Sequence, residues 1–249
     1  MPAETDYRGF RLEVDAISIL TFDMPRANIL STPVLNGLVA ALETLAATKT
    51  VRALVMANAG KTFLAGADIK EMSAFKQADA RRFSRLFHRA ASLIETLPVP
   101  VIASVNGFCL GGGLEIILAC DFVIASKSSV IGAPEINLGI VPGAGGTQRL
   151  PARIGKLRAK ELILTGRRLS ADEAAEIGLI NRAVGDEELS AEVNNLAGLL
   201  AEKPAQAVKA AKRLINSGTL AKEIAEWSRL FSYGDPKRLM EEFLGRPRK

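Results

Sequence analysis

The chain has 249 residues, of which 48% are hydrophobic and 24% are charged. That composition is typical of one or two compact domains with a large core, and it excludes a disordered chain. The formal net charge is +5, but the cations are scattered and no long basic run or aromatic platform accompanies them. We therefore do not expect nucleic acid as the main partner, and RNA binding stays a minor alternative that could accompany another activity.

The sequence also predicts a compartment. It contains no apolar run of about 18 residues, the length that a membrane helix needs. The first ten residues carry Glu4 and Asp6 and have no apolar core, so we expect neither a signal peptide nor a transit peptide. Cys109 and Cys120 lie in apolar stretches without zinc-binding spacing, as small buried thiols do. We therefore expect a cytoplasmic protein.

The residue types present limit the chemistry. His88 is the single histidine, which excludes a histidine-rich metal cluster, and its helical surroundings favour an ordinary surface or packing role. The glycines at 143 and 145 are followed by Gln148 where a dinucleotide motif needs glycine, and no phosphate-binding Gly-Lys-Ser/Thr occurs. We expect no metal, and we expect carboxylates to be the acids and bases of any active site.

Strands and helices alternate along the first half of the chain. Apolar periodicity predicts strands at 10–14, 17–22, 51–56, 101–105 and 122–125. The 3.6-residue pattern predicts helices at 34–45, 79–97 and 114–119, the first of them beginning at Ser31 or Thr32 before Pro33. Such alternation is typical of an α/β core.

Beyond Gly146 the pattern becomes mostly helical. Ser170 with Glu173 forms a capping-box sequence, and helical patterns follow from Glu187, Pro204 and Leu220 with little strand signal. We expect an α/β core over residues 1–190 and a helical assembly region over 191–249.

A glycine cluster followed by a buried acid is the first sign of chemistry. Gly111, Gly112 and Gly113 come between a strand and a short helix, where free N–H groups can bind an anion or where the glycines can simply serve a tight turn. Glu115 follows in an almost wholly apolar helix, and an ionised carboxylate there is costly unless it is paired or its pKa rises. A raised pKa suits a general acid or base. The alternative is that Glu115 faces a solvent gap or pairs with a structural arginine.

Two further segments have a similar character. In the run Pro134–Leu150, Glu135 sits in apolar company before a glycine-rich loop, although an acid there can also just begin a short helix. In Thr62–Met72, Gly66 would expose the N–H of Ala67 at a helix start, while Asp68 alone predicts no more than a capped helix.

Together these segments resemble the enoyl-CoA hydratase/isomerase superfamily, the crotonases. The matching motifs are Ala-Gly-Ala-Asp-Ile-Lys-Glu-Met at 65–72, Gly-Gly-Gly-Leu-Glu at 111–115 and Pro-Glu-Ile-Asn-Leu-Gly-Ile-Val-Pro-Gly-Ala-Gly-Gly-Thr-Gln-Arg-Leu at 134–150. The similarity runs from Asp23 to the end of the chain. It implies a spiral of β-β-α units with a helical C-terminal region that trimerises, and two trimers that stack into a hexamer.

The resemblance also implies an activity, the syn addition of water to a 2-trans-enoyl-CoA during fatty-acid or related acyl-CoA degradation. Glu115 is implied to activate water and Glu135 to protonate the α-carbon, while the N–H groups of Ala67 and Gly112 bind the thioester oxygen. No separate cofactor is implied, because coenzyme A is part of the substrate. An enoyl-CoA isomerase and a branched-acyl or methylglutaconyl-CoA hydratase remain alternatives, since the paired glutamates are what separates these reactions.

The remaining CoA and substrate contacts come from the resemblance alone. They fall on Arg26, Ala27, Ala65, Ala67, Asp68, Ile69, Lys70, Gly112, Gly143 and Phe243. The C-terminus departs from the family pattern, since Arg238, Leu239 and Met240 precede Phe243 and Gly245-Arg246-Pro247 follows it. Phe243 is expected to line the acyl region of a neighbouring subunit.

Overall fold

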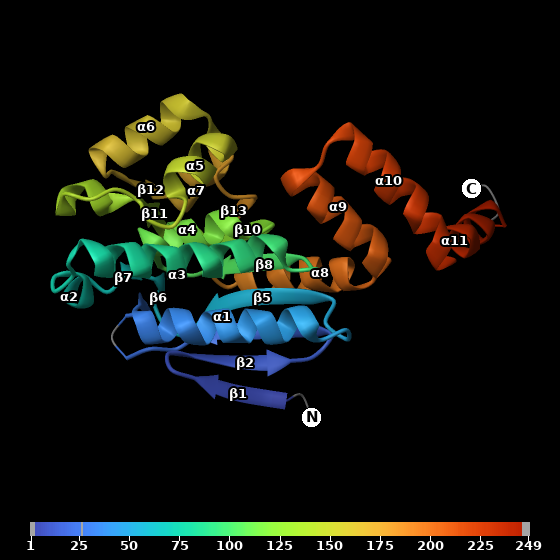
Figure 1. Cartoon of the computed structure of the whole chain (residues 1–249), viewed down its shortest axis with the longest axis horizontal. Helices are drawn as coiled ribbons and strands as arrows, with labels where there is room; N and C mark the ends of the chain where they lie inside the picture. The colour runs from blue at the N-terminus through green and yellow to red at the C-terminus, as the bar shows by residue number, and fades with distance from the viewer. Residues whose placement is uncertain (1–2, 26, 246–249) are drawn as a thin grey trace.

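A computed structural model of the protein describes residues 3–25 and 27–245 (Figure 1). Its main sheet has seven strands in the order β1-β2-β3-β5-β8-β10-β13. Their bounds are β1 (Ala3–Tyr7), β2 (Phe10–Val14), β3 (Ile17–Phe22), β5 (Ala53–Asn58), β8 (Val101–Val105), β10 (Phe122–Ser126) and β13 (Arg182–Val184). The first three strands pair antiparallel and the others pair parallel from β3 onward. The parallel strands β5, β8 and β10 are buried nearly throughout, as expected of strands covered on both faces.

Two smaller sheets stand beside the main one. The four-stranded sheet has the order β12-β11-β9-β6, and the two-stranded sheet pairs β4 with β7. The bounds are β4 (Ile29–Leu30), β6 (Thr62–Leu64), β7 (Gly66–Ala67), β9 (Phe108–Leu110), β11 (Val130–Gly132) and β12 (Arg168–Ser170). These short strands place the chain turns that carry the glycine motifs next to one another.

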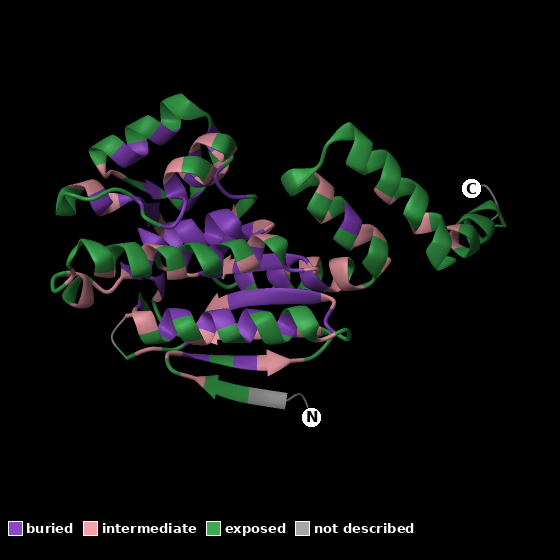
Figure 2. Ribbon diagram, viewed as in Figure 1, coloured by how far each residue is buried: buried purple, intermediate pink, exposed green. Residues whose placement is uncertain are grey.

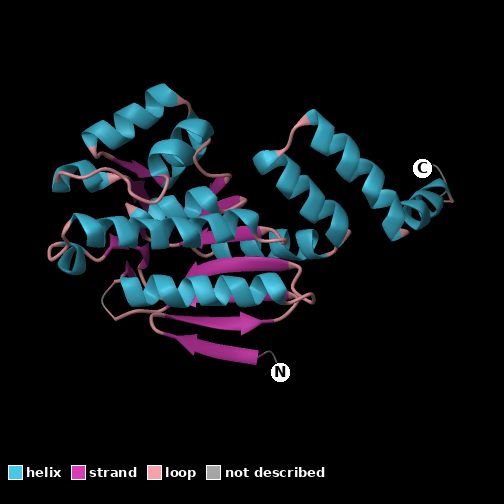
Figure 3. Ribbon diagram, viewed as in Figure 1, coloured by secondary structure: helices cyan, strands magenta, loops and turns pink. Residues whose placement is uncertain are grey.

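Helices cover both faces of the main sheet (Figures 1 and 3). α1 (Thr32–Ala47), α3 (Gln77–Thr96) and α4 (Gly112–Ala119) pack on one face, where the larger core cluster lies. α8 (Leu189–Ala201) covers the other face by packing Leu189, Val193 and Ala197 against strand residues such as Val55 and Ile102. α4 is the central helix of this arrangement, and all eight of its residues are buried (Figure 2).

A cap of short helices closes one end of the body. It consists of α2 (Ile69–Met72), the 3₁₀ helix η1 (Pro134–Leu138), α5 (Gly146–Ile154), α6 (Lys156–Thr165) and α7 (Ala171–Glu176). α5 packs on α4, and α6 packs on α5 and η1. These contacts bring Glu135 and the loop before α5 to the start of α4.

The last helices extend away from the body as an arm, here defined as residues 205–245. It contains α9 (Ala205–Ser217), α10 (Leu220–Leu230), the 3₁₀ helix η2 (Phe231–Tyr233) and α11 (Asp235–Leu244). Most of the arm is exposed (Figure 2). Lys212 of α9 joins it to the body through an ion pair with Asp121 at 2.6 Å and hydrogen bonds to the carbonyls of Ile94 and Val99.

The predicted α/β core and helical C-terminal region are confirmed. β2, β3 and β8 have the predicted bounds, whereas β5 begins two residues later than predicted, at Ala53. α3 begins at Gln77 rather than at Asp79, because the Asp79 carboxylate accepts the N–H of Lys76 from inside the first turn. The expectation of little strand after Gly146 missed β12 and β13, which are three residues each and too short to show periodicity.

In the described part of the chain, no helix is both long enough and apolar enough to cross a membrane. Ser170 caps α7 by accepting the N–H of Glu173, as predicted, but the Glu173 carboxylate pairs with Arg167.

Candidate active site

Glu115 lies at the start of α4, where the chain turns from β9 into the helix. Its side chain is only 4% exposed among apolar neighbours. Oε1 accepts the N–H of Ala144 at 2.6 Å and that of Gly146 at 2.8 Å. The loop before α5 and the first residue of that helix therefore hold this carboxylate by two hydrogen bonds. The expected alternative of a solvent gap is therefore wrong.

Two opposing effects set the pKa of Glu115. Burial raises the pKa above that of an ordinary glutamate, while the N–H groups of Gly146, Ala144 and Gly143 and the charge of Arg149 lower it. The hydrogen bonds go to the ionised form, because a carboxylate is the stronger acceptor. Glu115 is thus a buried carboxylate prepared to carry a negative charge.

Glycines in the loop leave room for these hydrogen bonds to Glu115. A Cβ at Gly146 would lie 3.0 Å from Glu115 Oε1, so a side chain there would crowd the carboxylate. Gly145 has φ +103, a conformation that L side chains rarely adopt, and it is the N-cap of α5. The N–H groups that reach Glu115 therefore come from the free N-terminal end of α5 and the residues just before it.

Glu135 lies on η1 and faces the same helix start. It is 9% exposed, and a Cβ at Gly111 would lie 3.1 Å from its Oε1. Both of its carboxylate oxygens are buried without a hydrogen-bond partner among the described residues. Burial, together with the nearby charge of Glu115, raises the pKa of Glu135 to about 7.

The two glutamates therefore share one site in contrasting environments. Glu115 receives hydrogen bonds that favour its charge, whereas the Glu135 carboxyl receives none from the residues that the structure describes and is stabilised in the protonated form. A pair of acids whose environments separate their pKa values is suited to accept one proton and donate another near neutral pH.

Two main-chain N–H groups lie next to this pair. A Cβ at Gly66 would be 3.6 Å from the Gly112 nitrogen, and a Cβ at Gly112 would be 3.5 Å from the Ala67 nitrogen. The end of β7 and the start of α4 thus bring the amides of Ala67 and Gly112 together. The first N–H groups of a helix have no intrahelical acceptor, so that of Gly112 is available to an oxyanion.

The segment after Ala67 is held by its own side chains. Asp68 caps α2 by accepting the N–H groups of Lys70 and Glu71. The Glu71 carboxylate accepts the N–H of Thr32 at 2.9 Å, which ties α2 to the start of α1. The Asp68 carboxylate is therefore occupied in a cap, as the alternative interpretation expected.

The other predicted contact residues are spread over the surface around this site. Ala27, Ala65 and Gly143 lie in described loops, and the Ala65 N–H donates to the carbonyl of Asn28 at 2.7 Å. Ile69 and Lys70 are exposed at the start of α2. Arg26 lies outside the described residues.

Phe243 is the predicted residue that the fold does not bring to the glutamates within one chain. It is 72% exposed on α11, which lies at the far end of the arm from α4 (Figure 1).

Cys109 and Cys120 are buried free thiols, and His88 is exposed on α3.

Sequence reasoning missed three contributors to the site. Asn28 is 2% exposed, and its amide donates to the Thr62 carbonyl at 2.7 Å, fixing β4 beside β6. Phe87 lies against the Cα of Gly112. Arg149 of α5 donates to the carbonyl of Ala144, next to the amide that binds Glu115. Of the three, Arg149 alone lies inside a quoted motif, and the direction of its side chain cannot be read from spacing.

Within the described ranges, no group of three or more His, Cys, Asp or Glu side chains could hold a metal ion. The fold and this site define a crotonase-fold protein, with paired glutamates beside two converging backbone amides. The comparisons with known proteins agree: the Enoyl-CoA hydratase/isomerase family matches residues 13–232.

Individual relatives extend over nearly the whole chain. A short-chain-enoyl-CoA hydratase of Clostridium acetobutylicum is 38% identical over 92% of this chain and 91% of its own. A crotonyl-CoA hydratase of Syntrophomonas wolfei is 38% identical over 96% of this chain and 95% of its own. The crystal structure of an enoyl-CoA hydratase from Bacillus anthracis aligns with a TM-score of 0.85 at 37% identity, covering 90% of each chain. The chain belongs to the enoyl-CoA hydratase/isomerase family.

Proposed function

We propose that this protein is an enoyl-CoA hydratase, which adds water to a 2-trans-enoyl-CoA and gives the 3-hydroxyacyl-CoA. The observation that carries the proposal is the presence of two buried glutamates at the same helix start, one hydrogen-bonded and the other without a hydrogen-bond partner in the described part of the chain. Relatives named as hydratases of short enoyl-CoA thioesters support the same reaction.

The reaction begins at the two amides. The thioester oxygen accepts the N–H groups of Ala67 and Gly112, and these stabilise the negative charge that collects there as the β-carbon is attacked. Preorganised donors of this kind are typically worth roughly 3–4 kcal/mol of transition-state stabilisation for each donor.

The two carboxyl groups then divide the proton transfers. Glu115 accepts a proton from water while the water oxygen forms a bond to the β-carbon, and the electron pair of the C=C bond moves onto the thioester as an enolate. Glu135 gives its proton to the α-carbon, and the thioester carbonyl re-forms. The carboxyl groups exchange one proton between them to restore the starting state, so the net reaction consumes one water.

The remaining contacts position the CoA part of the substrate. We propose that Ala27, Ala65, Asp68, Ile69, Lys70 and Gly143 line its path, with Arg26 from outside the described residues. Lys70 is exposed at the start of α2 and can approach the phosphates, whereas Asp68 would contribute through its main chain.

A spectrophotometric screen of 2-trans-enoyl-CoA thioesters of increasing length tests the function. Loss of the conjugated thioester absorbance, with a product heavier by one water, is the expected result. An isomerase would move the double bond without adding mass, and a branched-acyl hydratase would turn over only branched substrates. A salt-sensitive shift of RNA in a gel would reveal the minor RNA-binding activity.

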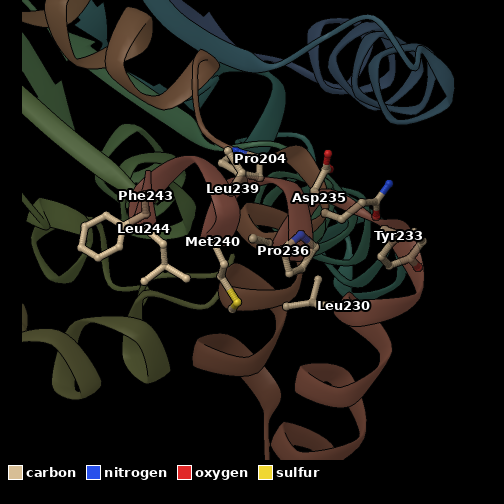
Figure 4. Close-up of a pocket in the computed structure, with 11 residues that line it drawn as sticks. Pro204, Leu230, Tyr233, Asp235, Pro236, Leu239, Met240, Phe243 and Leu244 are labelled. Carbon is tan, nitrogen blue, oxygen red and sulfur yellow. The ribbon is translucent and has the colours of Figure 1, made fainter. Parts of the chain in front are cut away.

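We also propose a homohexamer of two trimers that forms through the arm. Leu220, Ile224 and Trp227 of α10 are 80%, 71% and 62% exposed, so this apolar stripe is not buried within its own subunit. Figure 4 shows a second apolar surface, where Leu230, Met240, Phe243 and Leu244 line one groove. Neighbouring subunits would cover both surfaces, and Phe243 would then reach a neighbour's acyl pocket.

The cellular setting is part of the same proposal. Buried free thiols at Cys109 and Cys120 suit the reducing cytoplasm, and the reaction suits fatty-acid or related acyl-CoA degradation. Cell fractionation with an antibody against the protein tests the location.

A further inference from the structure

Arg149 connects the loop that grips Glu115 to the end of α3. Its Nη1 donates to the carbonyl of Ala144 at 3.0 Å, and its Nη2 donates to Glu95 Oε2 at 2.8 Å. The Ala144 amide in turn donates to Glu115. The Arg149 guanidinium thus bridges α3 and the loop before α5, and it binds the same residue, Ala144, whose N–H binds the proposed base Glu115.

The guanidinium is committed to this bridge. Arg149 is 17% exposed at its side chain, and its Nε is buried without a hydrogen-bond partner among the described residues. A Cβ at Gly145 would lie 2.2 Å from Nη1, so glycine at 145 is what lets the arginine reach the Ala144 carbonyl. The motif Gly-Ala-Gly-Gly-Thr-Gln-Arg therefore contains both the N–H groups that bind Glu115 and the arginine that fixes their loop.

Glu95 is itself anchored at the last turn of α3. Its carbonyl accepts the side-chain amide of Asn216 from α9 at 3.0 Å, while its carboxylate pairs with Arg149. The bridge thereby rests on the junction between the body and the arm.

We propose that Arg149, held by Glu95, is a positioning residue that fixes the loop at residues 143–146 around Glu115 and keeps that carboxylate ionised. The proposal rests on the proposed role of Glu115 as the base. The planar guanidinium of Arg149 presents its two donors at fixed angles, to the Ala144 carbonyl and to the Glu95 carboxylate, and the ammonium of a lysine on its different stem does not reproduce that geometry.

The charged groups that face Glu115 determine how it titrates. Arg149 from α5 lowers the pKa of Glu115, and Glu135 from η1 is coupled to it. From α3, Glu95 accepts Nη2 of Arg149 at 2.8 Å, and Cε1 of His88 would lie 3.6 Å from a Cβ at Gly145. Loss of the Arg149 charge should therefore raise the pKa of Glu115, and the acid side of the pH profile should move upward.

The test compares Arg149→Met, Arg149→Lys, Glu95→Ala and the Arg149→Met/Glu95→Ala double variant with the wild-type enzyme. Arg149→Met should lose about 10- to 100-fold in kcat, with KM within about twofold, because a displaced base affects the transition state more than ground-state binding. The acid limb of kcat against pH should move to higher pH. Arg149→Lys keeps the positive charge, so its acid limb should lie at the wild-type pH, but only part of the wild-type kcat should return.

Glu95→Ala should lose about three- to tenfold in kcat, and the double variant should be no slower than Arg149→Met alone, because residues that act in series are not additive. Arg89→Met is the matched control, since Arg89 lies on α3 like Glu95 and its substitution removes an exposed ion pair with Glu43 of α1. It should leave both kcat and the pH profile unchanged.

An activity-independent measurement separates this proposal from the proposed function. Infrared difference titration, with the Glu115 carboxyl band assigned by its loss in Glu115→Gln, should show a higher pKa in Arg149→Met than in the wild type. Arg149→Lys is titrated in parallel; it keeps the charge, so its Glu115 pKa should stay at the wild-type value. An unchanged Glu115 pKa or a wild-type kcat and acid limb in Arg149→Met would overturn the positioning role, and where Arg149→Met does not fold, a wild-type kcat in Glu95→Ala would do the same. If no enoyl-CoA is hydrated but the pKa moves as expected, only the proposed function fails.

Discussion

The main-chain N–H of Ala144 donates to Oε1 of Glu115 across 2.6 Å, joining the loop before α5 to the start of α4. This bond explains how an acid can sit in a helix whose other residues are apolar or glycine. The carboxylate loses its water but gains two N–H donors, which offsets much of the cost of burial. The Glu135 carboxyl, which lies beside Gly111, receives no such hydrogen bond from residues 3–25 and 27–245.

The first prediction follows from this contrast and concerns stability. Folding raises the pKa of Glu135 from 4.5 to about 7, so its protonated form is favoured in the native state. The stability that this provides is complete below about pH 4.5 and is lost as the pH rises through about 7. Glu135→Gln remains neutral and should keep that stability.

At pH 8 the Glu135→Gln variant should therefore be more stable than the wild type by roughly 3–3.5 kcal/mol, since the pKa rises from 4.5 to about 7 and each pKa unit corresponds to about 1.4 kcal/mol. At pH 4 the two proteins should be alike. Urea unfolding at both pH values and at equal protein concentration measures the difference. Equal stability at pH 8 would mean that Glu135 is not held in a desolvated state.

The second prediction is the shape of the pH profile. Hydration needs Glu115 ionised and Glu135 protonated, so kcat/KM should fall in acid as Glu115 takes up a proton. It should fall again above about pH 7 as Glu135 loses its proton. The apparent pKa values belong to the coupled pair. Initial rates from pH 5 to 9 measure both limbs, and a rate that keeps rising to pH 9 would contradict the role of Glu135 as proton donor.

The third prediction concerns Gly112. A methyl group there would meet the buried ring of Phe87 at 2.6 Å, so the start of α4 must move away from Ala67. Gly112→Ala should lose about 10²- to 10³-fold in kcat, the usual cost of disturbing one oxyanion donor.

Gly198→Ala is the matched control for that substitution. Gly198 lies within α8, and nothing lies within 4 Å of the added Cβ. This variant should keep full activity and gain up to about 1 kcal/mol of stability from the better helix propensity of alanine. Similar rates for the two variants would show that the amide of Gly112 is not part of the site.

The fourth prediction concerns assembly. Trp227→Glu places a charge in the exposed stripe of α10. There the ring of Trp227 lies edge-to-face with that of Phe231, and the two ring centroids are 4.8 Å apart. Multi-angle light scattering across a dilution series should show hexamers for the wild type and smaller species for the variant. Lys222→Glu changes an exposed residue on the opposite side of the same helix and should leave the hexamer intact. A wild-type protein that is a fully active monomer at micromolar concentration would rule out both the hexamer and the shared pocket.

The sequence predicted the fold where patterns are long. The alternating residues of β2 and β3 and the helical stripe of α1 gave their elements correctly, because burial on one face imposes a period. β13 escaped prediction because a three-residue strand at the sheet edge, Arg182–Val184, has no period to detect.

The site divides in a similar way. Glu115 and Glu135 could be selected because acids in apolar company are conspicuous, and the glycines because they mark close backbone approach. Which of the two acids is hydrogen-bonded depends on a loop that lies some thirty positions away from Glu115, and Arg149 is recognised only when the fold brings it to Ala144. Such contacts depend on the tertiary path of the chain.

The most direct test of the central claim is the rate at which Glu115→Gln and Glu135→Gln hydrate crotonyl-CoA and longer enoyl-CoA thioesters, compared with the wild type. Each variant should lose at least about 100-fold in kcat while keeping its fold and its affinity for CoA, because positioned acid–base groups contribute factors of about 10² to 10⁴. The double variant should be little slower than the slower single variant, since the residues act as a unit. Near-normal hydration by either single variant would contradict the two-acid site.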